Sequence, residues 1–136
     1  MQLYSKGCEY AIKALLHMKE QGKNYGARAI CRKARIPESF SRKVFQSLVR
    51  GDFLEAISGP GGGYRLKNHP KEISILDIVK AVDGEKAYDQ CVMGLSKCQN
   101  SNPCVLHESW QNTKKKLTSE LGTKYLQDLM DQQEKK

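Results

Sequence analysis

The sequence predicts a mainly α protein: a winged helix-turn-helix with a two-stranded wing, followed by a long C-terminal dimerisation helix. Three observations indicate this fold. Apolar residues recur at helical spacing along most of the 136 residues, as in amphipathic helices. Two short helical patterns meet across a tight turn, which is typical of a helix-turn-helix. A glycine-rich turn between two short β patterns follows at once, where a wing belongs.

The first three helices are predicted over residues 5–20, 27–34 and 38–50. Gly22 ends the first and Gly51 the third, and Pro37 separates the second from the third because the residue before a proline disfavours helical geometry. Their expected inward faces are Cys8, Ala11, Ile12, Leu15, Leu16 and Met18; then Ala27, Ile30, Cys31 and Ala34; then Phe40, Val44, Phe45, Leu48 and Val49.

The wing is predicted from a strand over 53–57, a turn of sequence SGPGGG over 58–63 and a return strand that begins at Tyr64. Such a turn needs the backbone freedom of glycine. A glycine run can also cradle a nucleotide phosphate, but GPGGGY lacks the lysine and hydroxyl residue of that motif and no helix follows it. We therefore interpret the run as a wing turn.

The second half of the chain predicts a fourth helix, a cysteine loop and a long helix. Ser74 caps the fourth helix, with Asp77 at its third position, and Gly84 ends it. Asn102 before Pro103 is typical of a helix start, and Gly122 is expected to break the long helix before one or two more apolar turns. The predicted organisation is a winged domain over 1–84, a metal-binding loop over 85–104, a dimerisation helix and C-terminal turn over 103–130, and a frayed tail over 131–136.

The long helix carries a narrow apolar stripe, made of Leu106, Trp110, Thr113, Leu117 and Leu121. A stripe of this width does not need two partners within one subunit. We expect it to pack against its twin in a two-fold homodimer, the commonest oligomer. Two wings and two reading helices related by a two-fold axis fit a roughly palindromic site on double-stranded DNA.

The charge balance agrees with a nucleic-acid partner. The chain has 23 basic and 15 acidic residues, a net charge of +8, and such an excess favours a polyanion. No basic amphipathic helix with an aromatic face supports a membrane surface. The N-terminal residues contain neither a signal peptide nor a membrane span, so we expect a cytoplasmic protein, and five cysteines without a secretion signal do not predict a disulfide framework.

Candidate DNA contacts lie on two helices and the wing. Ser39, Ser41, Arg42 and Lys43 are expected to face the major groove, where Arg42 and Lys43 can pair with guanine and Ser39 can reach a base or a phosphate. Phosphate contacts are expected from Arg28, Arg32, Lys33 and Arg35, and wing contacts from Ser58 and Tyr64.

A metal-binding segment is predicted at Cys91, Cys98, Cys104 and His107, spaced C-x6-C-x5-C-x2-H. Thiolates are the standard protein ligands of iron–sulfur clusters. Structural zinc usually takes paired C-x2–4-C ligands, which are absent here, and a direct thiol redox switch needs no third cysteine. His107 lies three residues after Cys104, on the same face of the expected helix start. Cys31 is interpreted as a core residue.

The runs IPESFSRKVFQSLVRGDFLEAISGPGGGYRL and ISILDIVKAVDG, the three cysteines and the long helix occur in that order. Over residues 1 to about 130 this pattern resembles the Rrf2 family of bacterial transcription regulators. The resemblance implies a dimeric DNA-binding regulator, and the three cysteines place it with the members that bind an iron–sulfur cluster, [2Fe–2S] or [4Fe–4S]. Related members carry arginine just before GPGGGY, where this chain has Ser58, which implies weaker reading of the minor groove by the wing.

The resemblance leaves two candidates for a fourth cluster ligand. One cluster-binding member uses the histidine of the same Cys-x2-His sequence, which implies His107 and favours [2Fe–2S]. Another uses an acidic residue of the first helix to bind the cluster of the opposite subunit, and the matching position here is Cys8, which suits [4Fe–4S]. Cys8 can equally be a buried apolar residue of the first helix.

The predicted function is a dimeric transcriptional regulator whose DNA affinity is controlled by the cluster, in response to iron–sulfur status, redox state or nitric oxide. The alternative is a winged-helix repressor with a structural zinc or a thiol redox switch. An electron carrier fits the wing poorly. An enzyme is not expected, because no complete Cys-His-Asp set or cofactor loop is present.

Overall fold

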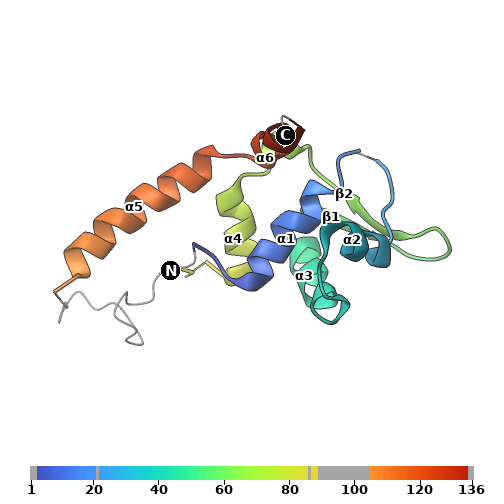
Figure 1. The fold of residues 1–136 in the computed structure, drawn as a ribbon, viewed down its shortest axis with the longest axis horizontal. Helices are drawn as coiled ribbons and strands as arrows, with labels where there is room; N and C mark the ends of the chain where they lie inside the picture. Colours follow the sequence, from blue (N-terminus) through green and yellow to red (C-terminus); the bar gives the residue numbers. More distant parts are fainter. Residues whose placement is uncertain (1–2, 21, 86, 89–104, 135–136) are drawn as a thin grey trace.

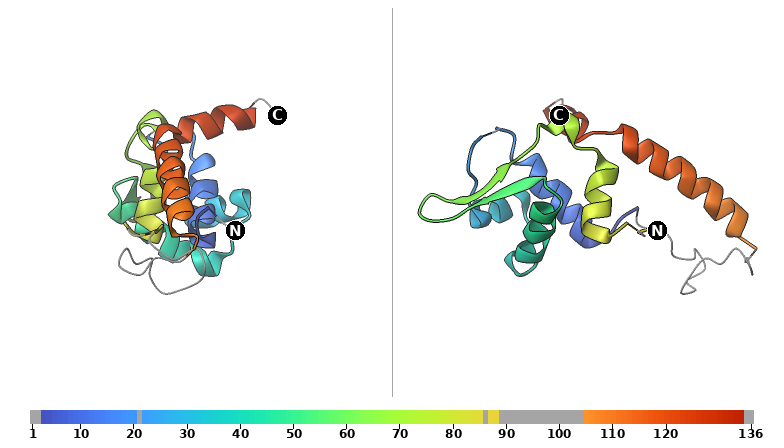
Figure 2. Two further views of the ribbon diagram at one scale, coloured as in Figure 1. Left: turned by 90° about the vertical axis from the view of Figure 1, so that its left-hand side faces the viewer. Right: turned by 180° about the vertical axis from the view of Figure 1, so that it is seen from behind.

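The computed structural model describes residues 3–20, 22–85, 87–88 and 105–134. Their elements, in chain order, are α1 (Lys6–Leu16), α2 (Ala27–Ala34), α3 (Glu38–Arg50), β1 (Leu54–Ile57), β2 (Gly63–Leu66), the short 3-10 helix η1 (Pro70–Glu72), α4 (Ile75–Asp83), α5 (His107–Thr123) and α6 (Leu126–Glu134). Helices α1 to α4, α6 and the β-hairpin form a winged head, and α5 extends from it as an arm (Figures 1 and 2). The predicted mainly α winged fold is confirmed.

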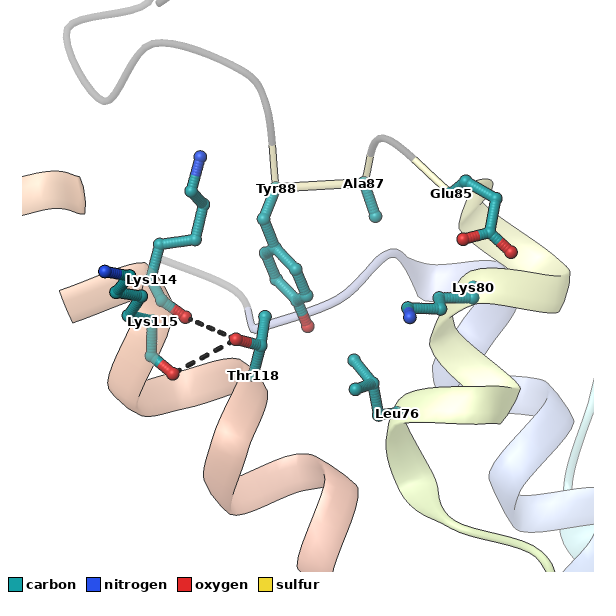
Figure 3. A pocket seen from close by; sticks show the side chains of 8 residues that line it. All are labelled: Leu76, Lys80, Glu85, Ala87, Tyr88, Lys114, Lys115 and Thr118. Atoms are coloured by element: carbon teal, nitrogen blue, oxygen red, sulfur yellow. Dashed lines mark hydrogen bonds between the residues drawn. The ribbon is translucent and has the colours of Figure 1, made fainter. Parts of the chain in front are cut away.

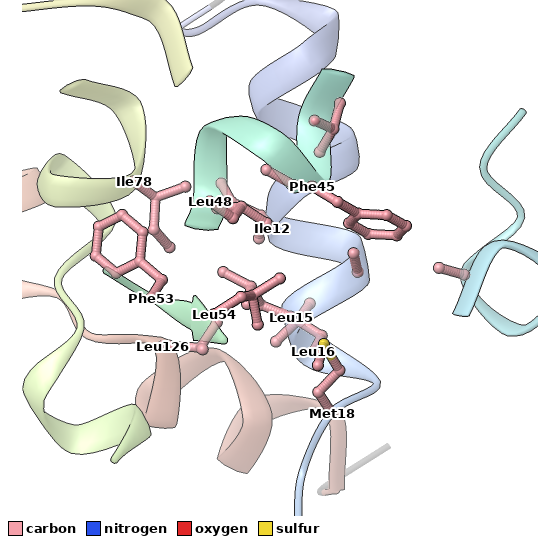
Figure 4. Close-up of a cluster of buried hydrophobic side chains, with 14 of the residues drawn as sticks. Ile12, Leu15, Leu16, Met18, Phe45, Leu48, Phe53, Leu54, Ile78 and Leu126 are labelled. Carbon is pink, nitrogen blue, oxygen red and sulfur yellow. The ribbon is translucent and has the colours of Figure 1, made fainter. Parts of the chain in front are cut away.

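Helix α1 lies at the centre of the head and contacts α2, α3, α4 and α6. Its buried side chains include Leu15, which joins Phe45 and Leu48 of α3 and Ile78 of α4 in one core (Figure 4). The helix ends at Leu16, earlier than the predicted residue 20, because the chain then turns to bury Met18.

The helix-turn-helix consists of α2 and α3. Between them, Arg35 adopts left-handed geometry with φ of 57°, and the amide of Ile36 donates to the carbonyl of Cys31 at 2.9 Å. Ile36 is buried, which fixes the direction in which α3 leaves the turn. The prediction that Phe40 faces inward is wrong: its side chain is 53% exposed and contacts the ring of Tyr10 at the edge of the core.

Steric limits account for the glycines of the wing. Strands β1 and β2 pair antiparallel from Leu54↔Leu66 to Ile57↔Gly63, and the backbone of Tyr25 adds a bridge to Tyr64. A Cβ on Gly63 would lie 2.2 Å from the carbonyl oxygen of Tyr25, and the residue has φ of 141°. Only glycine allows so close an approach of two backbones, so the run is structural, as predicted.

Helix α4 begins at the predicted cap, where the hydroxyl of Ser74 accepts from the amide of Asp77 at 3.1 Å. The C-terminal end of the chain returns to this point. Leu126 donates its amide to the carbonyl of Ile73 at 2.8 Å, and the side chains of Leu126 and Met130 are buried in the head. Helix α6 therefore belongs to the core of the head, and residues 131–134, which were expected to fray, continue it.

Helix α5 begins later than predicted and ends one residue past its predicted break. Asn102 and Pro103 lie outside the described residues, but Val105 and Leu106 form a turn, so the helix begins at His107 rather than at residue 103. The break predicted at Gly122 lies one residue later, after Thr123, and α6 supplies the further apolar turns. Gly122 faces α4, where a Cβ would meet Cδ2 of Leu76 in ordinary van der Waals contact at 3.5 Å.

Candidate DNA interface and metal-binding segment

The exposed face of α3 carries three of the four side chains predicted to read DNA. Ser39, Arg42 and Lys43 are exposed, at spacings that place them on one side of the helix. Ser41 is 8% exposed, and its hydroxyl donates to the carbonyl of Glu38 at 2.8 Å. Ser41 therefore belongs to the inner side of α3 and we leave it out of the DNA-reading surface.

Gln46 is a further candidate that the sequence analysis missed. It is exposed on α3, three residues after Lys43 and four after Arg42. Helical periodicity alone could have found it, since these spacings put it on the same face. A glutamine amide can pair with an adenine edge, so the face offers amide and guanidinium groups together.

The basic side chains of the helix-turn-helix are also accessible. Arg28, Arg32 and Lys33 of α2 are exposed, and so is Arg35 in the turn before α3. Exposed cations beside the helix predicted to read DNA are suited to phosphate contacts, which orient a protein on DNA without reading its sequence.

The wing presents less to solvent than the sequence suggested. Ser58 is exposed at the turn. Tyr64 is partly buried, because its ring lies against that of Phe45, with 4.8 Å between centroids. Arg65 is paired with Glu55 across the strands at 2.9 Å. The accessible polar groups at the tip of the wing are therefore small.

The three cysteines of the predicted metal site, Cys91, Cys98 and Cys104, lie outside the described residues. The described chain reaches this segment from Tyr88, after α4, and leaves it at Val105, just before α5. His107 is the first residue of α5 and is partly exposed. Over the residues that the structure covers, no group of three or more potential metal ligands comes together.

Cys8 and Cys31 are both free thiols in the core of the head. Cys31 is buried on α2, which confirms its interpretation as a core residue. Cys8 is completely buried on α1. Burial raises the pKa of its thiol to about 12, and the nearby carboxylate of Asp83 adds to the effect, so this packing favours the neutral thiol over the thiolate that a metal requires.

A hollow of about 180 Å³ lies between α4 and α5 (Figure 3). Tyr88 projects into it, and its hydroxyl donates to the carbonyl of Leu3 at 2.7 Å. Thr118 lines the opposite side, where its hydroxyl donates to carbonyls of its own helix. The remaining lining consists of Leu76, Lys80, Glu85, Ala87, Lys114 and Lys115.

Comparison with known proteins identifies the family. The model of the Rrf2 family, described as iron-dependent transcriptional regulators, matches residues 4–132. The chain belongs to the Rrf2 family. It is a DNA-binding transcriptional regulator and not an enzyme, as predicted. Within the described residues of this Rrf2 chain, none of the helices is both long and apolar enough to cross a membrane.

Relatives of this Rrf2 chain match almost end to end. The transcriptional regulator IscR of Xenorhabdus nematophila is 30% identical over 98% of this chain and 82% of its own length. An HTH-type transcriptional regulator of Neisseria meningitidis is 30% identical over 97% of this chain and 89% of its own. Among solved structures, CymR of B. subtilis matches with a TM-score of 0.78, at 19% identity, over 96% of this chain and 98% of its own.

A second solved structure, of an IscR protein, has the same fold. IscR of T. potens matches with a TM-score of 0.75, at 17% identity, over 96% of this chain and 88% of its own. At such identities the likeness concerns the fold alone. The winged head and the extended helix of this Rrf2 chain are therefore an arrangement that its solved relatives share.

The donor chemistry of the cysteine segment fits an iron–sulfur cluster. Three cysteines in a polar segment supply three thiolates. His107 adds an imidazole that is accessible in the described structure, whereas Cys8 is enclosed in the core of its own subunit. Of the two candidate fourth ligands, His107 therefore fits with less rearrangement of the head.

Proposed function

We propose that this Rrf2 protein is a homodimer whose affinity for DNA is controlled by an iron–sulfur cluster held by Cys91, Cys98 and Cys104. The observation that carries the proposal is the position of the cysteine segment in the chain. It leaves the head just after α4, at Tyr88, and enters α5 at His107. A group bound there would connect α4, which packs against α3, to the arm.

We assign His107 as the fourth ligand. Its place at the start of α5 supports this choice, because a ligand there ties the cluster directly to the arm. Cys8 remains the competing ligand, from the opposite subunit. It would first have to leave a core in which it is fully buried, and exposing such a side chain has an energetic cost.

When bound, the cluster would supply iron and sulfide that change with oxidation, nitric oxide or iron supply. The protein's own residues would translate that state into DNA affinity. The proposed base-reading groups are Ser39, Arg42 and Lys43 on α3, and the proposed phosphate contacts are Arg28, Arg32, Lys33 and Arg35. Ser58 and Tyr64 keep a lesser proposed role in the wing.

The arm supports the proposed dimer. Trp110 is the buried residue of α5, while Leu106 is 41% exposed and Leu117 and Leu121 are partly exposed on the same side. A second copy of the helix would cover this stripe and set the spacing of the two heads. Two heads related by a two-fold axis require two half-sites in a roughly palindromic operator.

Anaerobic purification with iron and sulfide supplied, followed by visible absorption and iron and sulfide analysis, tests the metal assignment. We expect a coloured protein that loses its cluster when Cys98→Ser is introduced. His107→Ala should bind the cluster poorly or with an altered spectrum, and Cys8→Ala should keep the parent spectrum.

The reverse result for the last two variants would assign the fourth ligand to Cys8. A colourless protein containing one zinc per chain would instead favour the alternative function, a regulator with a structural zinc. A colourless, metal-free protein whose DNA affinity changes on thiol oxidation would favour the thiol switch.

A further inference from the structure

Three hydrogen bonds fasten the first residues of the chain to Asp83, the last residue of α4, and to Tyr88, which follows that helix. The amide of Ser5 donates to Oδ2 of Asp83 at 2.9 Å, and the hydroxyl of Ser5 donates to Oδ1 of the same carboxylate. The hydroxyl of Tyr88 donates to the carbonyl of Leu3 at 2.7 Å. We call this group of four residues, Leu3, Ser5, Asp83 and Tyr88, the clasp.

The clasp controls the start of α1. Ser5 is the N-cap of that helix, and its hydroxyl also accepts from the amide of Cys8 at 3.1 Å. Asp83 therefore holds the residue that caps α1. Because α1 packs directly against α3, a movement of its first turn is transmitted to the helix that carries the DNA-reading side chains.

The other end of the clasp is set by a tight turn. Gly84 has φ of 95° and ψ of 161°, a region that essentially only glycine occupies. The amide of Ala87 donates to the carbonyl of Gly84 at 3.2 Å. This turn gives Tyr88 a defined position relative to Asp83, so the two attachments act together.

The cysteine segment begins almost at once after the clasp. Cys91 follows Tyr88 by three residues, and three residues of extended chain span at most about 10 Å. The chain between Cys91 and Tyr88 is therefore too short to accommodate a large displacement of Cys91 without a displacement of Tyr88.

We propose that the clasp couples the state of the cysteine segment to α1, with Tyr88 and Asp83 as positioning residues that transmit it to the DNA-reading helix. This inference rests on the proposed function, because it needs a cysteine segment with two states. The bonds are solvent-exposed, so their effect is on the position of α1 rather than on the stability of the head.

Tyr88→Phe tests the proposal by removing one hydroxyl while keeping the ring in the hollow. The matched control is Tyr125→Phe, at an exposed tyrosine just before α6. The affinity for one operator is measured for cluster-loaded and cluster-free protein, and the ratio of the higher affinity to the lower is compared between variants. Amide hydrogen exchange over residues 3–10 is followed in the cluster-free protein.

We expect the ratio to fall at least threefold towards one in Tyr88→Phe, with faster exchange at Ser5 and Cys8 and an unchanged melting temperature. Asp83→Asn should act in the same direction, and Tyr125→Phe should behave as the parent. A purely structural role would lower the melting temperature and leave the ratio as in the parent.

The parent ratio could be well above one and remain unchanged in both Tyr88→Phe and Asp83→Asn. That result would overturn the proposed role of the clasp and leave the proposed function standing. Unchanged exchange at Ser5 and Cys8 in both variants would also overturn it. A parent ratio of one would contradict the proposed function and the clasp together.

Discussion

Helices α1 and α5 differ in how the protomer buries them. Six of the 11 residues of α1 are buried: Cys8, Ala11, Ile12, Ala14, Leu15 and Leu16. Trp110 is the one buried residue among the 17 of α5. The head therefore completes its own core, whereas the arm leaves Leu106 exposed and Leu117 only partly covered.

This difference separates two roles along one chain. Folding free energy is concentrated in the head, where α6 also returns to pack against η1 and α1. The arm contributes little to the core and is free to take part in assembly. The cysteine segment lies between the two in sequence, and under the proposed function a change there would alter the relation of head to arm without disturbing the core.

The largest expected effect comes from a cavity in the head. Leu48 is completely buried, so Leu48→Ala should lower the free energy of unfolding by about 2–5 kcal/mol, measured by urea denaturation. Gln46→Ala, on the exposed side of the same helix, should change it by less than about 0.5 kcal/mol. Similar losses in the two variants would contradict a self-sufficient core around α3.

A charge introduced on the arm is expected to weaken dimerisation rather than to destabilise the head. Leu117→Glu places a carboxylate in the proposed dimer stripe, and we expect it to weaken dimerisation at least about 100-fold, or roughly 2.7 kcal/mol, in sedimentation experiments. Ser119→Glu, on the other side of α5, is the control. If Leu117→Glu stays as dimeric as Ser119→Glu, the stripe is not the dimer contact.

The proposed DNA surface of the head can be divided into groups that read bases and groups that contact phosphates. Arg42→Ala should cost about 1–3 kcal/mol of affinity for the preferred operator, if it reads a guanine, and much less on random DNA. Arg32→Ala should weaken both DNAs alike and reduce the salt slope by about one. Fluorescence anisotropy at several salt concentrations measures both quantities.

Lys116→Ala, on the exposed side of the arm, is the control for these DNA measurements and should leave affinity nearly unchanged. Equal losses on operator and random DNA for Arg42→Ala would reassign that residue to phosphate binding.

The smallest effect is expected in the wing. The side chains of Arg65 and Glu55 are 34% and 48% exposed, and an ion pair this accessible to solvent contributes about 0–1 kcal/mol. Glu55→Gln should therefore leave the free energy of unfolding nearly unchanged in urea denaturation. A loss above about 2 kcal/mol would mean that the wing depends on side-chain pairing and not on the backbone bridge to Tyr25.

Much of the head follows from local signals in the sequence. The cap at Ser74, the stop at Pro37 and the glycine turn of the wing are each decided within a few residues, and the structure confirms them. The core position of Cys31 also follows from helical periodicity. These features need no information about distant parts of the chain.

The structure differs from the sequence predictions where contacts between distant parts of the chain determine the conformation. Phe40 lies at the border of the apolar face of α3, and periodicity cannot tell that Tyr10 covers only one side of its ring. The docking of Leu126 beside Ile73 depends on chain segments about 50 residues apart. The end of α1 is set by the burial of Met18.

The role of Cys8 could not be predicted from the sequence for the same reason. A cysteine on the apolar side of a helix is compatible with a ligand or with a core residue, and only packing distinguishes the two. In the structure its side chain is enclosed next to Asp83. The clasp could not have been anticipated either, because Ser5 and Asp83 are 78 residues apart.

The most direct test of the account is the DNA affinity of one protein preparation before and after anaerobic removal of its cluster, on the same operator and at the same salt concentration. The account predicts at least a fivefold difference between the two forms, the lower end of about 1–3 kcal/mol that is typical of such coupling. Equal affinities of cluster-loaded and cluster-free protein would contradict it.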